Sequence, residues 1–423
     1  MKYQTIKGTF DRLPEDAAGW SYVLERAKLV LERSGAGEIH TPVFEDVGVF
    51  SKAVGESSDI VRKEMYTFTD KGERSLCLRP EATAPLIRAY LEHGMASKPT
   101  PVKLWTFEPM FRAEKPQRGR QRQFHQLGLE IIGLADALAD AESIQIGWSI
   151  MNALGIHDYE IRLGSVGDPQ DRLEYNTYLK DLLSPVVSRL SSDSQERLAL
   201  NPMRILDSKD KNDQVILKEL SVKPMLEFLG DEARAHFELV QTYLQDWGIP
   251  FVVDASIVRG LDYYRRTAYE FIHRDPLLGA QSTILAGGRY DGLAEILGGP
   301  HTPGVGWGSG VERLLLALEA EKVAILAHPE ILAYVIPLEE NLISFAHSIA
   351  QIVRAVGKAQ AAYKVKGMGK ALADAEKLRA RYAIVVGSNE RDTQVINVRH
   401  LQSRTQEPVA IAELSNWFHS RSS

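Results

Sequence analysis

The feature that most constrains this fold is a pair of neighbouring segments, residues 102–111 and 122–133, separated by a basic stretch. Their residue patterns predict two β-strands, and because one follows the other directly we expect an antiparallel hairpin. The connecting loop is longer than the usual two to five or so residues, and long loops inside compact domains tend to be functional. The hairpin is therefore the first place to look for a site.

The second strand, QFHQLGLEII, has two unlike faces, because successive side chains of a strand point in opposite directions. One face carries Phe124, Gln126, Gly128 and Glu130, and the other carries His125, Leu127, Leu129 and Ile131. The second face suits a core, where His125 is expected to pack rather than to catalyse. A buried carboxylate is costly without a partner, so the first face suggests a pocket for a polar, cationic or hydrogen-bonding ligand. The alternative is a solvent-facing strand on which Phe124 packs incidentally.

The loop between the two strands is strongly basic, although the whole chain has a net charge of −6. From Arg112 to Arg122 it holds five lysines and arginines against Glu114 alone. Arg112 shares a strand face with Glu108 and Met110, and an arginine where a strand enters such a loop is well placed to bind phosphate through two donors. A surface ion pair at Arg112 and a solvated loop are the alternatives.

Three further segments combine glycine with chemistry-bearing side chains. In VRGLDYYRRTAYEF, the adjacent Tyr263 and Tyr264 point to opposite sides of any strand that holds them. In AGGRYDGL, paired glycines before Arg289 permit either a close approach of backbone to a ligand or a plain turn. The glycine-rich passage GVGWGSG leads into a helix that bears Arg313. No Walker loop occurs anywhere, so any ATP is not bound by a P-loop.

The pattern of predicted helices and strands divides the chain into three parts. Helical and strand patterns alternate through the first ~165 residues, with helices expected at 17–33 and 80–93. Residues 168–248 are mostly helical in spacing and predict an insertion, after which strand patterns return at 250–258, 267–273 and 281–286. From residue 330 the order β-α-β-α-β-β predicts a compact α/β domain. We therefore expect one domain over residues 1–325, interrupted by 168–248, and a second over 330–423.

Composition excludes several classes of protein. The only cysteine is Cys77, so neither a disulfide framework nor a cysteine zinc site is available. The N-terminus is polar and lacks the apolar run of a signal peptide. No stretch approaches the ~20 apolar residues of a membrane span. We therefore expect a cytoplasmic enzyme.

Together these segments resemble the class II aminoacyl-tRNA synthetases, and the histidyl-tRNA synthetase family in particular. HTPVFEDVGVF is similar to motif 1, FEPMFRAEKPQRGRQRQFHQLGLEIIG to motif 2 and GVGWGSGVERLLL to motif 3. RGLDYY and AGGRYDGL resemble the histidine-specific pair, LRPEATAPLIRAY resembles the amino-acid-binding helix, and NPMRILDSK lies in the insertion. The resemblance covers nearly the whole chain. It implies an α+β fold: an antiparallel sheet flanked by helices, with a helical insertion and a C-terminal α/β anticodon-binding domain.

The resemblance also implies a role for particular residues. Histidine would be bound by Glu81, Thr83, Gln126, Glu130, Arg259, Tyr263, Tyr264 and Tyr290. ATP would contact Arg112, Arg120, Phe124 and Arg313. Arg112 and Arg259 would be catalytic, and Gln117 and Arg118 would approach the acceptor stem of the tRNA. Mg²⁺ would accompany ATP, while no metal site built from protein ligands alone is implied.

The implied activity is the ATP-dependent attachment of histidine to histidine tRNA by a homodimer whose subunits meet at motif 1, with no membrane partner. One alternative is a non-catalytic, histidine-sensing paralogue that regulates ATP phosphoribosyltransferase. Another is a tRNA-binding or kinase-associated pseudo-synthetase. The chain departs from the family pattern in two places: motif 3 is richer in glycine, and the C-terminal domain lacks the usual glutamine-rich lysine stretch. No anticodon contact is therefore assigned to a residue.

Overall fold

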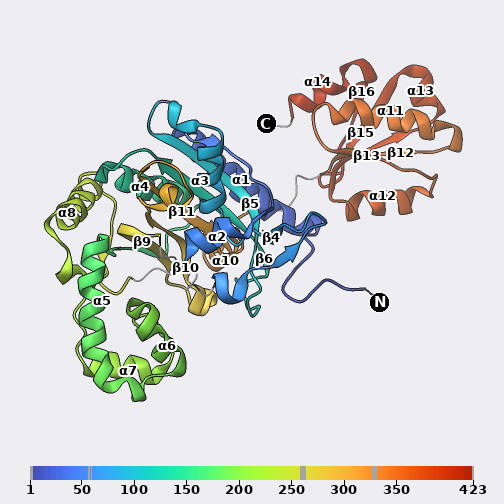
Figure 1. Ribbon diagram of the computed structural model, residues 1–423. Coiled ribbons are helices and arrows are strands. Elements are labelled where there is room, and N and C mark those ends of the chain that lie inside the picture. The colour runs from blue at the N-terminus through green and yellow to red at the C-terminus, as the bar shows by residue number, and fades with distance from the viewer. Residues whose placement is uncertain (1–2, 56–57, 59, 258–262, 326–330, 422–423) are drawn as a thin grey trace. The chain divides into compact units, whose positions relative to one another are not determined.

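The computed structural model describes residues 3–55, 58, 60–257, 263–325 and 331–421 (Figure 1). The chain separates into two compact units, Met1–Ile325 and Leu326–Ser423. Within the described ranges, no helix is both long and apolar enough to span a bilayer.

An extended antiparallel sheet forms the centre of the first unit. Its strands in the described residues follow the order β1-β5-β6-β11-β10-β9-β7-β8. Their bounds are β1 Gly37–Glu38, β5 Val102–Phe111, β6 Gln123–Ile132, β7 Tyr159–Ser165, β8 Val252–Val253, β9 Arg265–His273, β10 Thr283–Arg289 and β11 Gly304–Gly310. Among the described strands of this sheet, only the edge strands β1 and β8 pair in parallel with their neighbours. The expected hairpin is confirmed, because β5 and β6 pair antiparallel along their whole length, from Val102 opposite Ile132 to Phe111 opposite Gln123.

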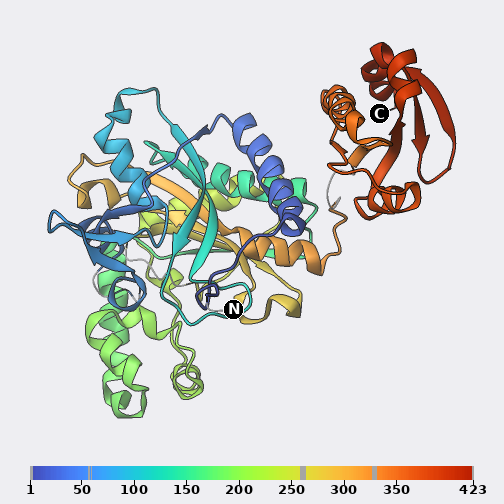
Figure 2. The same ribbon diagram turned by 90° about the vertical axis from the view of Figure 1, so that its right-hand side faces the viewer.

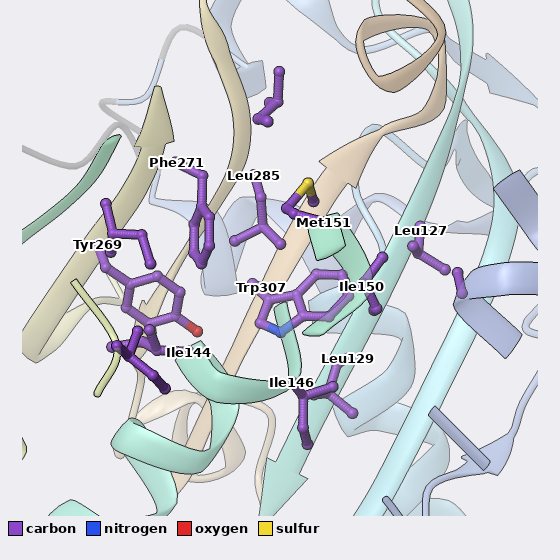
Figure 3. Close-up of a cluster of buried hydrophobic side chains, with 14 of the residues drawn as sticks. Leu127, Leu129, Ile144, Ile146, Ile150, Met151, Tyr269, Phe271, Leu285 and Trp307 are labelled. Carbon is purple, nitrogen blue, oxygen red and sulfur yellow. The ribbon is translucent and has the colours of Figure 1, made fainter. Parts of the chain in front are cut away.

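Helices cover the apolar face of this sheet. The helices of the body are α1 Pro14–Arg33, α2 Val47–Val54, α3 Thr83–Glu92, α4 Ala137–Leu154, α9 Leu293–Ile296 and α10 Val311–Ala320. Buried residues of α1, α4 and α10 join those of the sheet in one core. Figure 3 shows the centre of this core, where Trp307 of β11 lies among Leu129, Ile146 and Ile150. The predicted apolar face of β6 is confirmed, since Leu129 and its neighbours on that face are fully buried.

A small second sheet lies beside the first. Its order is β2-β4-β3, with bounds β2 Phe44–Asp46, β3 Thr67–Thr69 and β4 Ser75–Leu78. Helices α2, α3 and α9 contact one another and share a cluster of buried side chains that includes Tyr90, Tyr263 and Tyr290. The cluster contacts the polar face of β6 through Tyr290, whose hydroxyl donates to Glu130.

One segment had no predicted element and another differs from its prediction. The glycine-rich passage before α10 forms the strand β11, between β6 and β10. Its glycines recur at every second position and alternate with the buried Val305 and Trp307, so that one face is bare backbone and the other is core. Of the strand expected at 250–258, only Val252–Val253 pairs with the sheet. Both valines are exposed, so little burial holds a longer strand there.

The segment 168–248 is helical, as predicted. Its helices are α5 Pro169–Leu183, α6 Ser192–Leu200, α7 Lys211–Glu219 and α8 Asp231–Asp246. Figures 1 and 2 show α5, α6 and α7, drawn in green, projecting from the body of the unit. They pack around a cluster of their own that includes Tyr175, Leu179 and Ile216. By contrast, α8 packs against α4 and so attaches the insertion to the body.

The second unit is an α/β domain in which the predicted strands and helices occur in the predicted order. The structure adds a short helix between the last two predicted strands, and a strand and a helix after them. Its sheet has the order β13-β12-β14-β15-β16, in which β12 pairs in parallel with β13 and β14. The bounds are β12 Ile331–Pro337, α11 Ile343–Arg354, β13 Ala359–Ala361, α12 Met368–Lys377, β14 Ala380–Val386, α13 Ser388–Thr393, β15 Val395–His400, β16 Gln406–Ala410 and α14 Leu414–His419. Two buried clusters form around the sheet, one with α11 and α14 and the other with α12.

Candidate active site

The polar face of β6 opens onto a cavity of ≈ 250 Å³, whose walls come from the segment before α3, the loop after β5, β10, β11 and the start of α10. The structure brings most of the predicted site residues to this cavity. They are Glu81, Thr83, Arg112, Arg120, Phe124, Gln126, Glu130, Tyr263, Tyr264, Tyr290 and Arg313. Arg259 lies outside the described residues.

A buried carboxylate occupies one end of the cavity. Glu130 is 3% exposed and accepts hydrogen bonds from the hydroxyls of Thr83, at 2.7 Å, and Tyr290, at 2.5 Å. Burial raises the pKa of the Glu130 carboxyl to about 8, while the two hydroxyl donors oppose that rise. A carboxyl that titrates near neutrality in a pocket can donate to a ring nitrogen when it is protonated and accept from a ring N–H when it is ionised.

A second buried carboxylate, Glu81, lies at the start of α3. Its oxygens accept from the backbone N–H groups of Thr83, at 2.7 Å, and Ala84, at 2.9 Å. This explains why the helix begins at Thr83 rather than at the predicted Pro80: the Glu81 side chain takes the free amides of the first turn. Burial raises the pKa of Glu81. An ammonium group bound here would replace the hydration that the carboxylate has lost.

The bare face of β11 makes room for these side chains. A methyl group at Gly306 would lie 1.8 Å from a Glu130 carboxylate oxygen, and one at Gly308 would lie 2.3 Å from the amide nitrogen of Gln126. The alternating glycines are therefore required by the close approach of the Glu130 and Gln126 side chains to the neighbouring strand. They do not form a phosphate-binding loop.

Three guanidinium groups line the remainder of the cavity, and the charge of Arg112 opposes the rise in the pKa of Glu81. Arg112 donates to the carbonyl of Pro80 at 2.9 Å and lies over the Phe124 ring, 5.3 Å from its centroid. Arg313 donates to the carbonyl of Thr283 at 2.8 Å. Burial, followed by repulsion from Arg120 and Arg112, lowers the pKa of Arg313 to about 10. The mutual repulsion favours an anionic ligand with several charges, such as a polyphosphate.

Two acidic residues at this end were not predicted as site residues. Glu114 lies 2.6 Å from a guanidinium nitrogen of Arg120 and so holds that side chain in the cavity wall. Glu312 accepts twice, at 3.0 Å, from the backbone N–H of His125, which ties the first turn of α10 to β6. The sequence signal for Glu114 was its position as the only acid in a basic loop, and a long-range contact such as that of Glu312 leaves no local pattern.

Some residues singled out in the sequence lie away from the cavity. Gln117 and Arg118 are exposed in the loop between β5 and β6, and Arg118 lies 3.3 Å from Glu319. Arg289 is fully buried and donates to Asp140 and Asp291, so it anchors β10 and does not face a ligand. The two glycines before it belong to the strand β10, so the plain turn, one of the two alternatives for this segment, is wrong.

His125 packs as predicted on the core side of β6. Its ring lies 4.9 Å from Trp20, edge to face, and 6.2 Å from Phe107. A guanidinium nitrogen of Arg12 contacts the His125 ring, so the start of the chain closes over this edge of the sheet.

Two family models match the chain, and they correspond to its two folded units. The histidyl-tRNA synthetase model matches residues 8–314, and the anticodon binding domain model matches residues 332–421. The chain belongs to the histidyl-tRNA synthetase family.

The similarity extends over the full length of known members of the histidyl-tRNA synthetase family. The histidine–tRNA ligase of Deinococcus radiodurans is 48% identical, over 98% of this chain and 99% of its own length. That of Thermus thermophilus is 46% identical, over 99% of both chains. The crystal structure of apo S. aureus histidyl-tRNA synthetase superposes with a TM-score of 0.83 at 34% identity, over 99% of this chain and 100% of the other.

Proposed function

We propose that this chain is a histidine–tRNA ligase, which joins histidine to ATP as histidyl-adenylate, releases pyrophosphate and transfers histidine to the 3′ end of histidine tRNA. The observation that carries the proposal is the polarity of the cavity, with two buried carboxylates at one end and three arginines at the other. Relatives named histidine–tRNA ligases match the chain from end to end, including residues 332–421, and so favour the ligase over the regulatory paralogue.

The carboxylate end is proposed to bind histidine. Glu81, Thr83 and Gln126 would hold the α-amino group, and Glu130 and Tyr264 would bond the two imidazole nitrogens. Tyr263 and Tyr290 would complete the wall, and the hydrogen bond from Tyr290 fixes the orientation of the Glu130 carboxylate. Arg259 would contact both the histidine carboxylate and the α-phosphate.

The arginine end is proposed to bind ATP, with Phe124 stacked on adenine, Arg112 on the α-phosphate, and Arg120 and Arg313 on the β- and γ-phosphates. A carboxylate oxygen of histidine would attack the α-phosphorus in line with the departing pyrophosphate. Charge gathers there in the transition state, and fixed guanidinium groups stabilise it without reorganisation. Gln117 and Arg118, in the exposed loop, would meet the acceptor stem.

Mg²⁺ is proposed to enter with ATP. Among the described residues, no group of three or more His, Cys, Asp or Glu side chains could hold a metal ion. Magnesium is commonly bound through substrate phosphates with one or two carboxylates and several waters, which fits this arrangement. Glu114 and Glu312 line the arginine end and would supply those carboxylates. The bound ion would neutralise phosphate charge.

Histidine-dependent exchange of pyrophosphate into ATP, followed by charging of histidine tRNA, tests the function directly. We expect only histidine to support exchange at micromolar concentrations, because an apolar analogue would leave the Glu130 carboxylate unpaired. Equal exchange with another amino acid, or no exchange with any, would refute the ligase.

Substitution of Gly306 by alanine should abolish histidine binding. The added methyl would collide with the Glu130 carboxylate and with the carbonyl oxygen of Leu129, which lies 2.4 Å from its position. We expect histidine-dependent exchange to fall by at least about 100-fold, since overpacking moves buried groups or backbone. Gly292→Ala is the matched control, because a methyl at that position meets no atom within 4 Å. Exchange and thermal unfolding of both variants check the prediction, and wild-type exchange in Gly306→Ala would contradict it.

Deletion of residues 330–423 should leave pyrophosphate exchange unchanged and strongly reduce charging of histidine tRNA. The cavity belongs to the first unit, whereas the deleted part is matched by the anticodon binding domain model and carries 12 lysines and arginines against 9 acids. That charge balance suits an RNA partner. Exchange and charging are compared in the truncated and full-length chains. Unchanged charging after the deletion would remove the anticodon-binding role.

We propose a homodimer that forms through residues near Thr41–Phe50. Phe44 is 54% exposed and stacks edge to face on Phe68, which is 42% exposed, so an apolar patch faces solvent on the small sheet. Strand β2 is also an edge of that sheet. Exposed apolar patches commonly mark interfaces. Sedimentation at assay concentration should give twice the chain mass of 47.2 kDa, and an active monomer would contradict the proposal.

A further inference from the structure

A strained backbone position lies just after Tyr264 in the chain. Arg266 has a φ of 49°, in the left-handed region that costs free energy for a residue with a side chain. Among the described residues, it is the only non-glycine residue with a positive φ that lies inside a strand, here β9. Strain of this kind persists only where the surrounding structure imposes it, and it is common at functional sites.

The left-handed residue belongs to a bulge in β9. Between Ala268 and Arg265, β9 carries two extra residues relative to β10, and Arg266 is one of them. A bulge bends its strand and redirects the side chains beside it. A methyl group at Gly288 of β10 would lie 2.9 Å from a ring carbon of Tyr264, so this ring packs against bare backbone where it lines the cavity.

Ion pairs hold the Arg266 side chain in place. Its Nε donates to both carboxylate oxygens of Asp168, at 3.1 and 3.0 Å, and its Nη2 lies 2.9 Å from the same carboxylate. The Nη2 atom also donates to Glu232 at 3.3 Å. A guanidinium that meets one carboxylate through several donors is fixed in direction as well as in distance. The Asp168 pair is the main anchor, because Glu232 is largely exposed and exposed pairs contribute little.

Backbone contacts fasten the same segment. The N–H of Arg266 donates to the carbonyl of Gly167 at 3.0 Å, and its own carbonyl accepts from Val166 at 2.8 Å. Arg172 of α5 donates to the carbonyl of Tyr264 at 3.1 Å. These contacts come from the junction where the helical insertion begins, and residues of that junction lie outside the cavity wall. The insertion therefore holds the backbone that carries Tyr264 without lining the site itself.

We propose that Arg266 is a positioning residue for histidine recognition, whose left-handed backbone, anchored by Asp168, aims Tyr264 into the carboxylate end of the cavity. This inference rests on the proposed function, in which Tyr264 bonds an imidazole nitrogen. Arg266 does not line the cavity, so its loss acts on histidine through Tyr264. The start of the insertion thereby contributes to the choice of amino acid.

The experiment measures KM for histidine and KM for ATP in pyrophosphate exchange by the full-length chain. Arg266→Ala should raise KM for histidine by about tenfold, the usual effect of one lost hydrogen bond, and leave KM for ATP near that of the wild type. Arg266→Gly should raise KM for histidine by a smaller factor, because glycine adopts the left-handed backbone without strain. Arg274→Ala is the matched control and should leave both constants unchanged. Arg274 follows the other end of β9 and pairs with Asp158 at 3.6 Å.

A second readout separates positioning from general destabilisation. Tyr264→Phe removes the hydroxyl, so adding Arg266→Ala to it should not raise KM for histidine further. A purely structural role would raise KM for histidine by the same factor in both backgrounds. Asp168→Asn keeps Arg266 but weakens its anchor, and it should also raise KM for histidine. This variant tests the inference even if Arg266→Ala does not fold.

Three results would overturn the positioning role while the ligase stands. They are a wild-type KM for histidine in Arg266→Ala or Asp168→Asn, equal increases in Arg266→Ala and Arg266→Gly, and additive effects of Arg266→Ala and Tyr264→Phe. Absence of histidine-dependent exchange in the unaltered chain would instead refute the proposed function itself.

Discussion

Replacing Arg112 with alanine should lower the rate of histidine-dependent pyrophosphate exchange by about 10²–10³-fold, the usual cost of removing a fixed charge partner of the transition state. The guanidinium is already positioned, because its Nε donates to Pro80 and its plane lies near Phe124. The loss should appear mainly in kcat, since an interaction that strengthens in the transition state affects the rate more than substrate binding. Histidine affinity should change less than the rate, because Thr83, Gln126 and Glu130 remain in the cavity wall. Arg259→His should behave similarly.

Arg74→Ala is the matched control for this experiment. Arg74 is exposed and forms an ion pair with Asp70 away from the cavity, so its loss removes one positive charge without touching the site. Its exchange rate should equal that of the wild type. If the chain were instead the histidine-sensing regulatory paralogue, the wild type would show no pyrophosphate exchange. Arg112→Ala would then weaken histidine binding. Wild-type exchange in Arg112→Ala would make Arg112 a structural residue.

Above pH ~8, where the Glu130 carboxyl is ionised, Glu130→Gln should reduce kcat/KM for histidine by about 100-fold, because a hydrogen bond to a charged acceptor contributes ~1.5–3 kcal/mol. The substitution keeps the size of the side chain and one carbonyl acceptor for Thr83 or Tyr290, so the cavity should retain its shape. Steady-state exchange kinetics with histidine measure the effect. A KM for ATP close to that of the wild type would show that the arginine end is intact.

The pH dependence follows from the pKa of Glu130, about 8 in the folded chain. As pH rises through this value the carboxylate forms, so kcat/KM for histidine should rise and level off above pH ~8. This rise should be absent from Glu130→Gln. A wild-type profile that falls over the same range would contradict the proposed role of the carboxylate.

The free energy of unfolding should fall over the pH range in which kcat/KM for histidine rises. The folded pKa of Glu130 lies above its ordinary value of 4.5, so between these values the folded state holds more protons than the unfolded one. The contribution of Glu130 to stability is therefore present at low pH and lost as pH rises through about 8. Glutamine does not ionise, so the unfolding temperature of Glu130→Gln relative to wild type should be higher at pH 8.5 than at pH 5. An unchanged difference would mean that Glu130 titrates normally.

The sequence by itself determined the hairpin of β5 and β6, the two faces of β6 and the helical character of residues 168–248. These features depend on local periodicity: a period of two separates Glu130 from Leu129, and helical spacing recurs through the insertion. The resemblance to a family then supplied the site residues, and the structure gathers Glu81, Arg112 and Arg313 around one cavity although more than 200 residues separate the first from the last.

Only the tertiary structure decided the features that depend on contacts between distant segments. The passage GVGWGSG becomes a strand because β6 and β10 pair with both of its edges, and because its glycines admit Glu130 and Gln126. Arg289 is an anchor and not a ligand contact because Asp140, 149 residues away, meets it in the core. Likewise, α3 begins at Thr83 because Glu81 takes its first amides. Local sequence patterns do not predict these long-range contacts, since each residue alone is compatible with several environments.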